Sequence, residues 1–444
     1  MIRKLDQENL TYAFPEVAFD DDYVIATYQA KVKTSNIEKL AMAIADEQTT
    51  GTWIKVGADS MEKTRRFGSR LVALYEVPDI GCDYQSDEPP MYIIQIAYPM
   101  ANFSTSMSAL MTILFGNISA SGMIRLIDVA FPKKFIAQFQ GPKFGVQGMR
   151  DVLGAPERPL LNAMIKPNIG WTPDEGADLF YKACKGGVDV IKDDELMLAD
   201  SAFCPLVERV TKFMAAEKRV FEETGEHSLY AVNISDETAK VRDNAYRVLE
   251  AGGNCLMVNV YTTGFDTLKM LADDPNINVP ILAHVNFAGT MASSTYTGIA
   301  APLLVGKITR LAGGDFQING HPFGKFPVSY KLFYRCFKFF TQPWWNIKPM
   351  MYACSGGTTQ LAVEKIVKAV GTDVMLAAGG GVHGHPDGSE AGAKSMRQAI
   401  DAAMAGIPVV EYAKTHAELA RMLSFLNPDL MKNFDLMNYS IFQN

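Results

Sequence analysis

Apolar and polar residues alternate along this chain in two different rhythms, and the rhythm changes near residue 145. Before this point, the segments DDYVIATYQAKV, RLVALYEV and MYIIQIAYP have the short apolar patterns of strands, whereas NIEKLAMAIADEQTT has the spacing of an amphipathic helix. A Gly-Pro pair at 141–142 marks a break in the pattern. We therefore predict an N-terminal α+β domain over residues 1–145.

From residue 146 onward, short apolar runs alternate with longer helical stretches. The runs that we interpret as strands are LLNAMIK, VDVIKDD, SLYAVNI, CLMVNVY, VPILAHV, GDFQING, MMYACSG and TDVMLAAGG. Eight β/α alternations over roughly 250 residues predict a (β/α)8 TIM barrel over residues 146–444, with a C-terminal helical tail. An open, doubly wound parallel sheet is the alternative that the periodicity leaves open.

Charge and composition exclude several classes of protein. The chain has 42 Lys and Arg against 49 Asp and Glu, a net charge of −7, which argues against a nucleic-acid partner. No apolar run reaches the roughly 20 residues of a membrane span, and the start lacks the apolar segment of a secretory signal. The six cysteines form no CxxC pair. We therefore expect a cytoplasmic, enzyme-sized globular protein with neither nucleic-acid nor membrane partners.

Residues that can carry chemistry follow the predicted strands, which is where barrel enzymes place their active sites. Lys166 closes the first run, Lys192 to Glu195 close the second, and His284 and Asn286 close the fifth, whereas Lys325 follows the sixth, Ser355 to Gly357 the seventh and Gly379 to Gly381 the eighth. Because the carboxyl ends of barrel strands meet at one mouth, these positions predict a single site.

The IKDDE segment (191–195) crowds one lysine and three carboxylates directly after an apolar run. Such carboxylates repel one another unless water or a cation neutralises them, and adjacent carboxylates supply the oxygen ligands that Mg²⁺ prefers. The segment therefore predicts a magnesium site. A solvated helix N-terminus is the alternative.

Glycine clusters at 355–357 and 379–381 stand where barrel enzymes commonly bind phosphate, after strands seven and eight. The other interpretation is that these glycines only permit the backbone conformations that the turns require. Just beyond the second cluster, His383 and His385 form an H-x-H pair. Zinc needs further ligands, and none lies at suitable spacing, so we interpret both histidines as structural.

These residues lie in motifs that resemble, in order and over nearly the whole chain, the Rubisco superfamily. The motifs are EQTTGTW (47–53), FGN (115–117), GPKFG (141–145), IKPNIG (165–170), GGVDVIKDDE (186–195), AGGDF (312–316), GK (324–325), SGG (355–357) and GGGVHGHP (379–386). The resemblance implies a ferredoxin-like α+β domain followed by a (β/α)8 barrel. It also implies a homodimer or a multiple of dimers, because in that family the active site forms between one subunit's barrel and the partner's N-terminal domain.

The resemblance also assigns roles to residues. It implies that Lys192 reacts with CO2 to give a carbamate, which binds Mg²⁺ together with Asp194 and Glu195. Lys166 would move protons at the reacting carbons, and Lys325 would lie on a mobile lid loop. The other residues that it implies are His284, Asn117 and Glu47 as catalytic groups, and Thr52, Trp53, Ser355, Gly356, Gly357, Gly379 and Gly380 around one phosphate.

Several positions depart from the carboxylase pattern. A second lysine is replaced by Asn168, a His-Arg pair by Asn286 and Phe287, and a histidine of strand six by Ile318. The lost arginine and histidine would leave a second phosphate dianion facing apolar groups, which costs several kcal/mol. The chain therefore resembles the non-carboxylating, form IV Rubisco-like branch, and a bisphosphate is excluded as its expected substrate.

The expected activity is a Mg²⁺-dependent reaction that forms an enediolate from a small, singly phosphorylated, sugar-derived keto acid or ketose. We favour decarboxylation, because a lid cation at Lys325 suits a substrate carboxylate. One alternative is an isomerase or enolase of a (methylthio)ribulose or related sugar phosphate. The other is a catalytically idle binding or regulatory relative. The enzyme would accordingly be a lyase or an isomerase.

Overall fold

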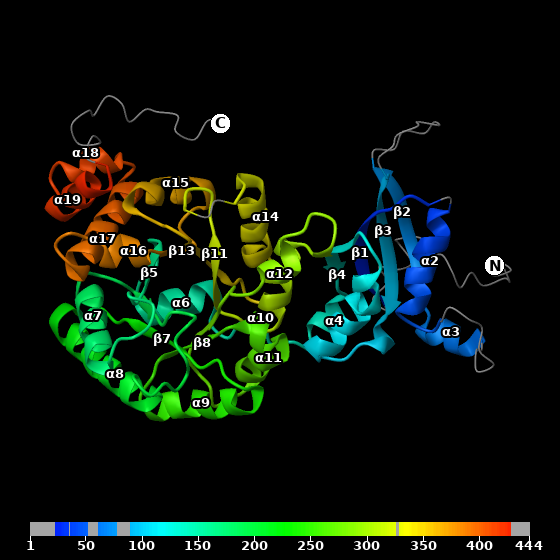
Figure 1. The fold of residues 1–444 in the computed structure, drawn as a ribbon, viewed down its shortest axis with the longest axis horizontal. Helices are drawn as coiled ribbons and strands as arrows, with labels where there is room; N and C mark the ends of the chain where they lie inside the picture. Colours follow the sequence, from blue (N-terminus) through cyan, green and yellow to red (C-terminus); the bar gives the residue numbers. More distant parts are fainter. Residues whose placement is uncertain (1–22, 35, 52–60, 78–88, 326–327, 428–444) are drawn as a thin grey trace. The chain divides into compact units, whose positions relative to one another are not determined.

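A computed structural model describes residues 23–34, 36–51, 61–77, 89–325 and 328–427 of the chain (Figure 1). Close contacts divide it into two compact units. One contains the chain up to residue 140 together with 287–312 and 344–347, and the other contains 141–286, 313–343 and the chain from 348 onward. Two predicted phosphate-site residues, Thr52 and Trp53, lie outside the described residues.

The N-terminal unit is built on one mixed sheet with the strand order β10-β4-β1-β3-β2. Its antiparallel pairs are β1 with β3, β1 with β4, and β2 with β3, which is the arrangement of a ferredoxin-like βαββαβ fold. The elements are β1 (Tyr23–Lys31), α2 (Ile37–Glu47), α3 (Met61–Phe67), β2 (Arg70–Val77), β3 (Met91–Pro99), η1 (Met100–Asn102), α4 (Met107–Phe115), η2 (Asn117–Ala120), β4 (Ile124–Ala130) and α5 (Lys133–Ile136). The ferredoxin-like prediction is thereby confirmed.

A later segment of the chain completes this sheet. Strand β10 (Gly298–Ile299) pairs in parallel with β4, and Lys307 Nζ lies 2.6 Å from Asp128 Oδ1 in the same unit. The other elements of this segment are α12 (Gly289–Ala292), η3 (Pro302–Ile308) and α13 (Thr309–Leu311). Residues between the fifth and sixth barrel strands therefore belong to the core of the N-terminal unit.

The second unit contains a closed barrel of eight parallel strands, so the predicted TIM barrel is confirmed and the open sheet is excluded. Each of the eight predicted runs contains one strand. The strands are β5 (Leu160–Met164), β6 (Val190–Lys192), β7 (Leu229–Asn233), β8 (Cys255–Val258), β9 (Ile281–Ala283), β11 (Phe316–Gly320), β12 (Met351–Ser355) and β13 (Val374–Ala377).

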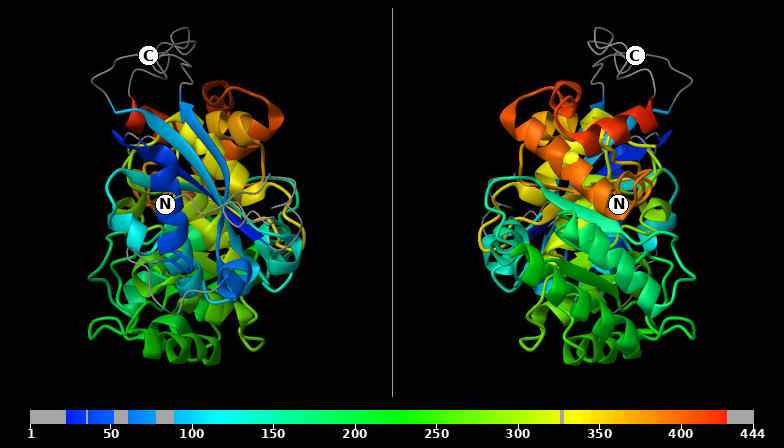
Figure 2. Two further views of the ribbon diagram at one scale, coloured as in Figure 1. Left: turned by 90° about the vertical axis from the view of Figure 1, so that its right-hand side faces the viewer. Right: turned by 90° about the vertical axis from the view of Figure 1, so that its left-hand side faces the viewer.

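Helices follow the strands around the outside of the barrel, except α6, which precedes β5 and packs against the apolar cluster inside the barrel (Figures 1 and 2). They are α6 (Gly145–Leu153), α7 (Pro173–Lys185), α8 (Leu206–Thr224), α9 (Thr238–Glu250), α10 (Val260–Thr263), α11 (Phe265–Asp273), α14 (Tyr330–Thr341), α15 (Gln360–Val370), α16 (Gly379–His383), α17 (Ser389–Ala405), α18 (Val409–Ala413) and α19 (Ala417–Leu426). Their ends follow local sequence signals: α7 begins with a capping box between Thr172 and Glu175. No helix in the described ranges is long and apolar enough to span a bilayer.

The barrel interior changes from apolar to polar toward the carboxyl ends of the strands. Val190 and Leu282 belong to the buried apolar cluster inside the barrel. Because side chains alternate along a strand, Lys192 and His284, two residues further on, face the same interior. The fold thus brings polar side chains from separate strands to one mouth of the barrel.

Candidate active site

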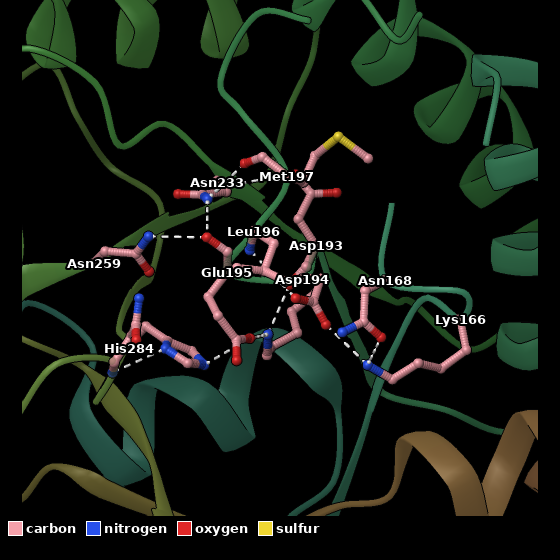
Figure 3. A network of polar contacts seen from close by, with 12 residues as sticks. Lys166, Asn168, Asp193, Asp194, Glu195, Leu196, Met197, Asn233, Asn259 and His284 are labelled. Atoms are coloured by element: carbon pink, nitrogen blue, oxygen red, sulfur yellow. Dashed lines mark hydrogen bonds and ion pairs between the residues drawn. The ribbon is translucent and has the colours of Figure 1, made fainter. Parts of the chain in front are cut away.

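Lysines and carboxylates from β5 and β6 meet at the carboxyl end of the barrel (Figure 3). Lys166 Nζ lies 2.8 Å from Asp194 Oδ2 and 2.7 Å from Asn168 Oδ1. Lys192 Nζ lies 3.3 Å from Glu195 Oε2 and donates to the Asp193 carbonyl oxygen at 2.7 Å. Two lysines and two carboxylates therefore lie together in one cluster.

Lys192 has no exposed surface, and this changes its chemistry. Burial lowers the pKa of its ammonium, although the neighbouring carboxylates Glu195 and Asp194 oppose the shift. Burial also acts to raise the pKa of Glu195, but Lys192 and hydrogen bonding outweigh burial and lower it. Burial thus shifts the protonation equilibrium of Lys192 toward the neutral, nucleophilic amine, while Glu195 stays ionised.

His284 adds a neutral imidazole to the cluster. Burial, reinforced by the Lys192 charge, lowers the pKa of His284 well below its usual range. Its Nδ1 accepts the backbone N–H of Asn286 at 3.1 Å, so the proton of the neutral ring is on Nε2. That nitrogen lies 3.3 Å from Glu195 Oε2, so His284 can donate to this carboxylate.

Asp193 is separated from the cluster although it is the neighbour of Asp194 in sequence. Its Oδ2 lies 3.2 Å from the guanidinium of buried Arg209, and its Oδ1 accepts the Tyr230 hydroxyl at 2.5 Å. The backbone N–H of Asn233 donates to the same carboxylate at 2.9 Å. Of the three carboxylates in the IKDDE segment, only Asp194 and Glu195 are therefore available to a ligand at the barrel mouth.

Two asparagines that we did not single out from the sequence hold this segment in place. Asn233 Nδ2 donates to the carbonyl oxygens of Met197 at 2.8 Å and Glu195 at 3.4 Å, and Asn259 Nδ2 donates to the Glu195 carbonyl at 3.1 Å. Both lie near the ends of predicted runs, in AVN and MVN. The rule that identified Lys166 and His284 could therefore have identified them.

The donor set fits a hard divalent cation only if Lys192 contributes. Within the described ranges, no three side chains of the His, Cys, Asp and Glu types gather closely enough to hold a metal. Asp194 and Glu195 supply two carboxylates, and Lys192 Nζ lies beside them. A carbamate on that amine would add the third oxygen ligand, which matches the oxygen preference of Mg²⁺.

The predicted lid lysine and the SGG turn are in direct contact. Lys325 is exposed, and its backbone N–H donates to the Gly356 carbonyl at 2.6 Å. A Cβ on Gly357, which has a φ of +105°, would come within 2.7 Å of Lys325 N. Beneath this contact, His321 Nε2 lies 2.9 Å from Thr358 Oγ1, a buried pair that our sequence analysis missed. Ser355 is buried at the end of β12.

The second glycine cluster borders Lys166. A Cβ on Gly379 would lie 2.4 Å from Met164 Sδ and 3.4 Å from Lys166 Cε. A Cβ on Gly380 would meet nothing within 4 Å, so the space beside that residue is open. Lys166 and the predicted phosphate residues Gly379 and Gly380 therefore lie close together.

The remaining predicted catalytic residues meet in the N-terminal unit. Asn117 Nδ2 donates to Glu47 Oε1 at 3.1 Å, and both residues are at least partly exposed. Glu47 ends α2 and Asn117 begins η2, so the pair is made by elements 70 residues apart.

The positions that depart from the carboxylase pattern have distinct environments. Asn168 is bonded to Lys166, whereas Ile318 is 4% exposed inside the barrel core. Phe287 has a φ of +73°, a conformation that L-residues with bulky side chains rarely adopt, and its side chain is exposed. Neither Phe287 nor Ile318 can donate a hydrogen bond from its side chain to an anion.

Family profiles match both units. The profile described as "Ribulose bisphosphate carboxylase large chain, catalytic domain" matches residues 145–426, and the corresponding N-terminal domain profile matches residues 11–135.

Relatives match at nearly full length. A "Ribulose bisphosphate carboxylase-like protein" of Archaeoglobus fulgidus is 44% identical over 396 residues, covering 89% of this chain and 90% of the relative. A "2,3-diketo-5-methylthiopentyl-1-phosphate enolase" of Geobacillus thermodenitrificans is 36% identical over 408 residues, covering 90% and 97%. The crystal structure of octameric ribulose-1,5-bisphosphate carboxylase/oxygenase from Pyrococcus horikoshii OT3 is 31% identical, with a TM-score of 0.85 and coverage of 92% and 94%.

Proposed function

Because the chain belongs to the ribulose bisphosphate carboxylase large chain family, we propose that it is a Mg²⁺-dependent enzyme that enolises a singly phosphorylated, sugar-derived ketone and does not carboxylate ribulose bisphosphate. The family resemblance drawn from the sequence motifs is confirmed by these matches. The observation that carries the proposal is the cluster of Lys166, Lys192, Asp194 and Glu195 at one barrel mouth.

Lys192, Asp194 and Glu195 would hold Mg²⁺. The bound ion would supply Lewis-acid polarisation of the substrate carbonyl, which acidifies the neighbouring C–H bond. Before this, the neutral Lys192 amine would add CO2 and release a proton, and thereby gain an anionic oxygen donor. Burial of Lys192 and its lowered pKa favour that reaction.

We assign proton transfer to Lys166. Its Nζ is held by Asn168 and Asp194, and its Cε borders Gly379 beside the open space at Gly380. A phosphate bound at these glycines would place the first carbons of a sugar chain near the amine. Lys166 Nζ would move the proton at the carbon next to the carbonyl.

The far end of the substrate is expected to lack a second phosphate. Ile318 is buried in the core and Phe287 offers only an aromatic ring, so neither can replace the hydrogen bonds that a dianion loses on leaving water. Incubation with ribulose bisphosphate and labelled bicarbonate should fix no label. Clear Mg²⁺-dependent fixation would contradict this part of the proposal.

We place enolisation first because the curated enolases match across nearly their entire length. Decarboxylation is the second candidate, and the position of Lys325 supports it. The Lys325 backbone is bonded to the SGG turn, so its ammonium group belongs to a loop at the phosphate end of the site. A cation there can pair with a substrate carboxylate, and loss of CO2 leads to the same enediolate.

The test is a screen of phosphorylated ketoses, diketones and keto acids in deuterated buffer with Mg²⁺ and bicarbonate. Deuterium uptake without CO2 release identifies an enolase or isomerase, and both together identify a decarboxylase. Lys166→Met is the control, because it should abolish deuterium uptake while leaving Mg²⁺ binding intact. Mg²⁺ binding with neither reaction would favour the idle, ligand-binding alternative.

We also propose a homodimer or a multiple of dimers. Large apolar side chains are exposed on the loops after β5 and β6, next to the cluster: Ile169, Leu196, Leu198 and Phe203. Leu198 is 64% exposed, and we take these four side chains as the candidate interaction surface. Light scattering should report at least a dimer, and Leu198→Asp should weaken it. A fully active monomer would contradict the proposal.

A further inference from the structure

The two histidines of the GVHGHP segment have different hydrogen-bonding environments. His385 uses both ring nitrogens: Nε2 donates to the Glu418 carbonyl at 3.0 Å, and Nδ1 accepts the Asp387 backbone N–H at 3.0 Å. His383 uses only one, because Nδ1 lies 2.9 Å from Ser389 Oγ while its buried Nε2 has no partner among the described residues. Leaving a buried nitrogen without a hydrogen-bond partner costs free energy, so such a nitrogen needs an explanation.

The free nitrogen of His383 lies on the side of the ring that faces away from Ser389, the first residue of α17. His383 ends α16 one helical turn after Gly379, so both residues lie on the same helix face. Gly379 is the residue against which Met164 and Lys166 Cε pack. Lys166 is also the charged group that acts on the His383 imidazole, so the two side chains lie near one another.

The imidazole is neutral at physiological pH. Burial lowers the pKa of His383 to about 4, and the nearby Lys166 ammonium acts in the same direction. A neutral ring carries one proton, and the Ser389 hydroxyl can accept it from Nδ1. His383 Nε2 then presents a lone pair, which is the group that a lysine ammonium requires.

Lys166 will need such a partner during function. An ammonium group has three N–H donors, and Lys166 Nζ gives two of them to Asp194 and Asn168. The proposed function assigns the Asp194 carboxylate to Mg²⁺. When that carboxylate turns to the cation, Lys166 loses its anionic partner and gains a positive neighbour.

We propose that His383 is a positioning residue for Lys166, and that its Nε2 accepts a hydrogen bond from Lys166 Nζ when Asp194 binds a divalent cation. The inference rests on the proposed function, because it needs the metal at Asp194. In this role, His383 keeps the Lys166 amine beside Gly379 and Gly380. His383 itself does not contact the reacting carbon.

The first test needs no substrate. The chain has six histidines, so ¹⁵N-histidine labelling of the full protein gives few signals, and loss of one signal in His383→Gln assigns His383. Adding Mg²⁺ with bicarbonate should move the His383 Nε2 resonance from the free toward the hydrogen-bonded range. The same addition to Lys166→Met should leave it in place.

The result distinguishes failure of the His383 role from failure of the proposed metal site. If calorimetry shows Mg²⁺ binding but the His383 resonance does not move, or moves equally in Lys166→Met, the role of His383 is contradicted while the metal site stands. If Mg²⁺ does not bind, the metal site of the proposed function fails, and the role of His383 fails with it.

A matched pair of variants gives the second test. The side-chain oxygen of His383→Gln reaches the position of Nε2, whereas that of His383→Asn reaches only the position of Nδ1. On a substrate that takes up deuterium, His383→Asn should lower kcat about tenfold at unchanged KM, the effect of one hydrogen bond to a charged group. His383→Gln should recover most of kcat. Equal kcat in both variants, or a change confined to KM, would contradict the assignment.

Discussion

The two ends of the barrel both contain buried charges, but they hold them differently. At the amino end, the residue immediately before a strand is repeatedly an aspartate with a fixed set of donors. Asp189 pairs with Arg158 at 2.6 Å and accepts the Leu161 N–H, and Asp315 accepts the N–H groups of Phe144, Gly145 and Ile281. Each of these carboxylates joins separate segments of the chain.

At the carboxyl end, charges of both signs share partners that a ligand can replace. Lys166 and Lys192 are held by Asp194 and Glu195, which are also the proposed metal ligands. The comparison indicates that the amino end of the barrel serves stability and the carboxyl end serves chemistry. It predicts that substitutions at the two ends will separate stability from activity.

The largest effect is expected for Lys192→Met at the carboxyl end. Without the proposed carbamate oxygen, turnover should fall by at least about a thousandfold, or roughly 4 kcal/mol, and Mg²⁺ binding should be lost. The free energy of unfolding should change by less than about 1 kcal/mol, because the remaining carboxylate of Glu195 is 34% exposed. Calorimetry and urea unfolding measure the two quantities. Lys182→Met, in an exposed pair with Asp178, is the control, and unchanged Mg²⁺ affinity in Lys192→Met would contradict the site.

Arg209→Met should have nearly as large an effect, but on stability. It leaves the Asp193 carboxylate buried without its cation, which typically costs about 3–5 kcal/mol of unfolding free energy. Arg219→Met on the same helix, α8, is the matched control, because that side chain is 63% exposed. Urea unfolding should show a large loss only for Arg209→Met. Combining it with Asp193→Asn should recover part of the loss.

Lys325→Met should lower turnover by about two orders of magnitude, or roughly 2.7 kcal/mol, on a substrate that carries a carboxylate. It should spare enolisation of an analogue without that group. The free energy of unfolding should not change, since the side chain is exposed. Steady-state kinetics on the paired substrates check this. Full activity on both would remove decarboxylation from consideration.

The smallest effect concerns Asp315 at the amino end. Burial raises the pKa of Asp315 to about 6, although three backbone N–H groups favour its ionised form. An unfolded aspartate titrates near 4, so the folded chain binds this proton more tightly, and the contribution of Asp315 to stability is fully present below about pH 4. That contribution decreases as the pH rises from about 4 to about 6.

Asp315→Asn removes this titration and costs about 2 kcal/mol of unfolding free energy at pH 4.5, since the amide nitrogen cannot accept a hydrogen bond, whereas the hydroxyl oxygen of the protonated carboxyl can. The difference between wild type and variant should therefore be smaller at pH 6.5 than at pH 4.5. Urea unfolding at the two pH values measures it. A difference that grows with pH would show that the carboxylate is stabilised in its ionised form.

Much of the fold could be predicted because its signals are local. Each barrel strand is a short apolar run that ends in polar residues, so β6 could be located from VDVIKDD and the candidate catalytic lysine, Lys192, from the end of the run. The same rule placed Lys166 and His284 at the mouth and, applied to every run, would have added Asn233 and Asn259. These features depend on neighbours within a few residues.

Contacts between distant segments decided the rest. Asp193 and Asp194 are identical in type and adjacent, yet one faces Arg209 of α8 and the other faces Lys166, because successive side chains point to opposite sides of a strand end. His383 and His385 also have partners on different elements, Ser389 of α17 and Glu418 of α19. Sequence alone determined which residue types are present and how they are spaced. Only the tertiary structure decided which of them face a common space, because burial and charge pairing depend on segments that the chain brings together from far apart.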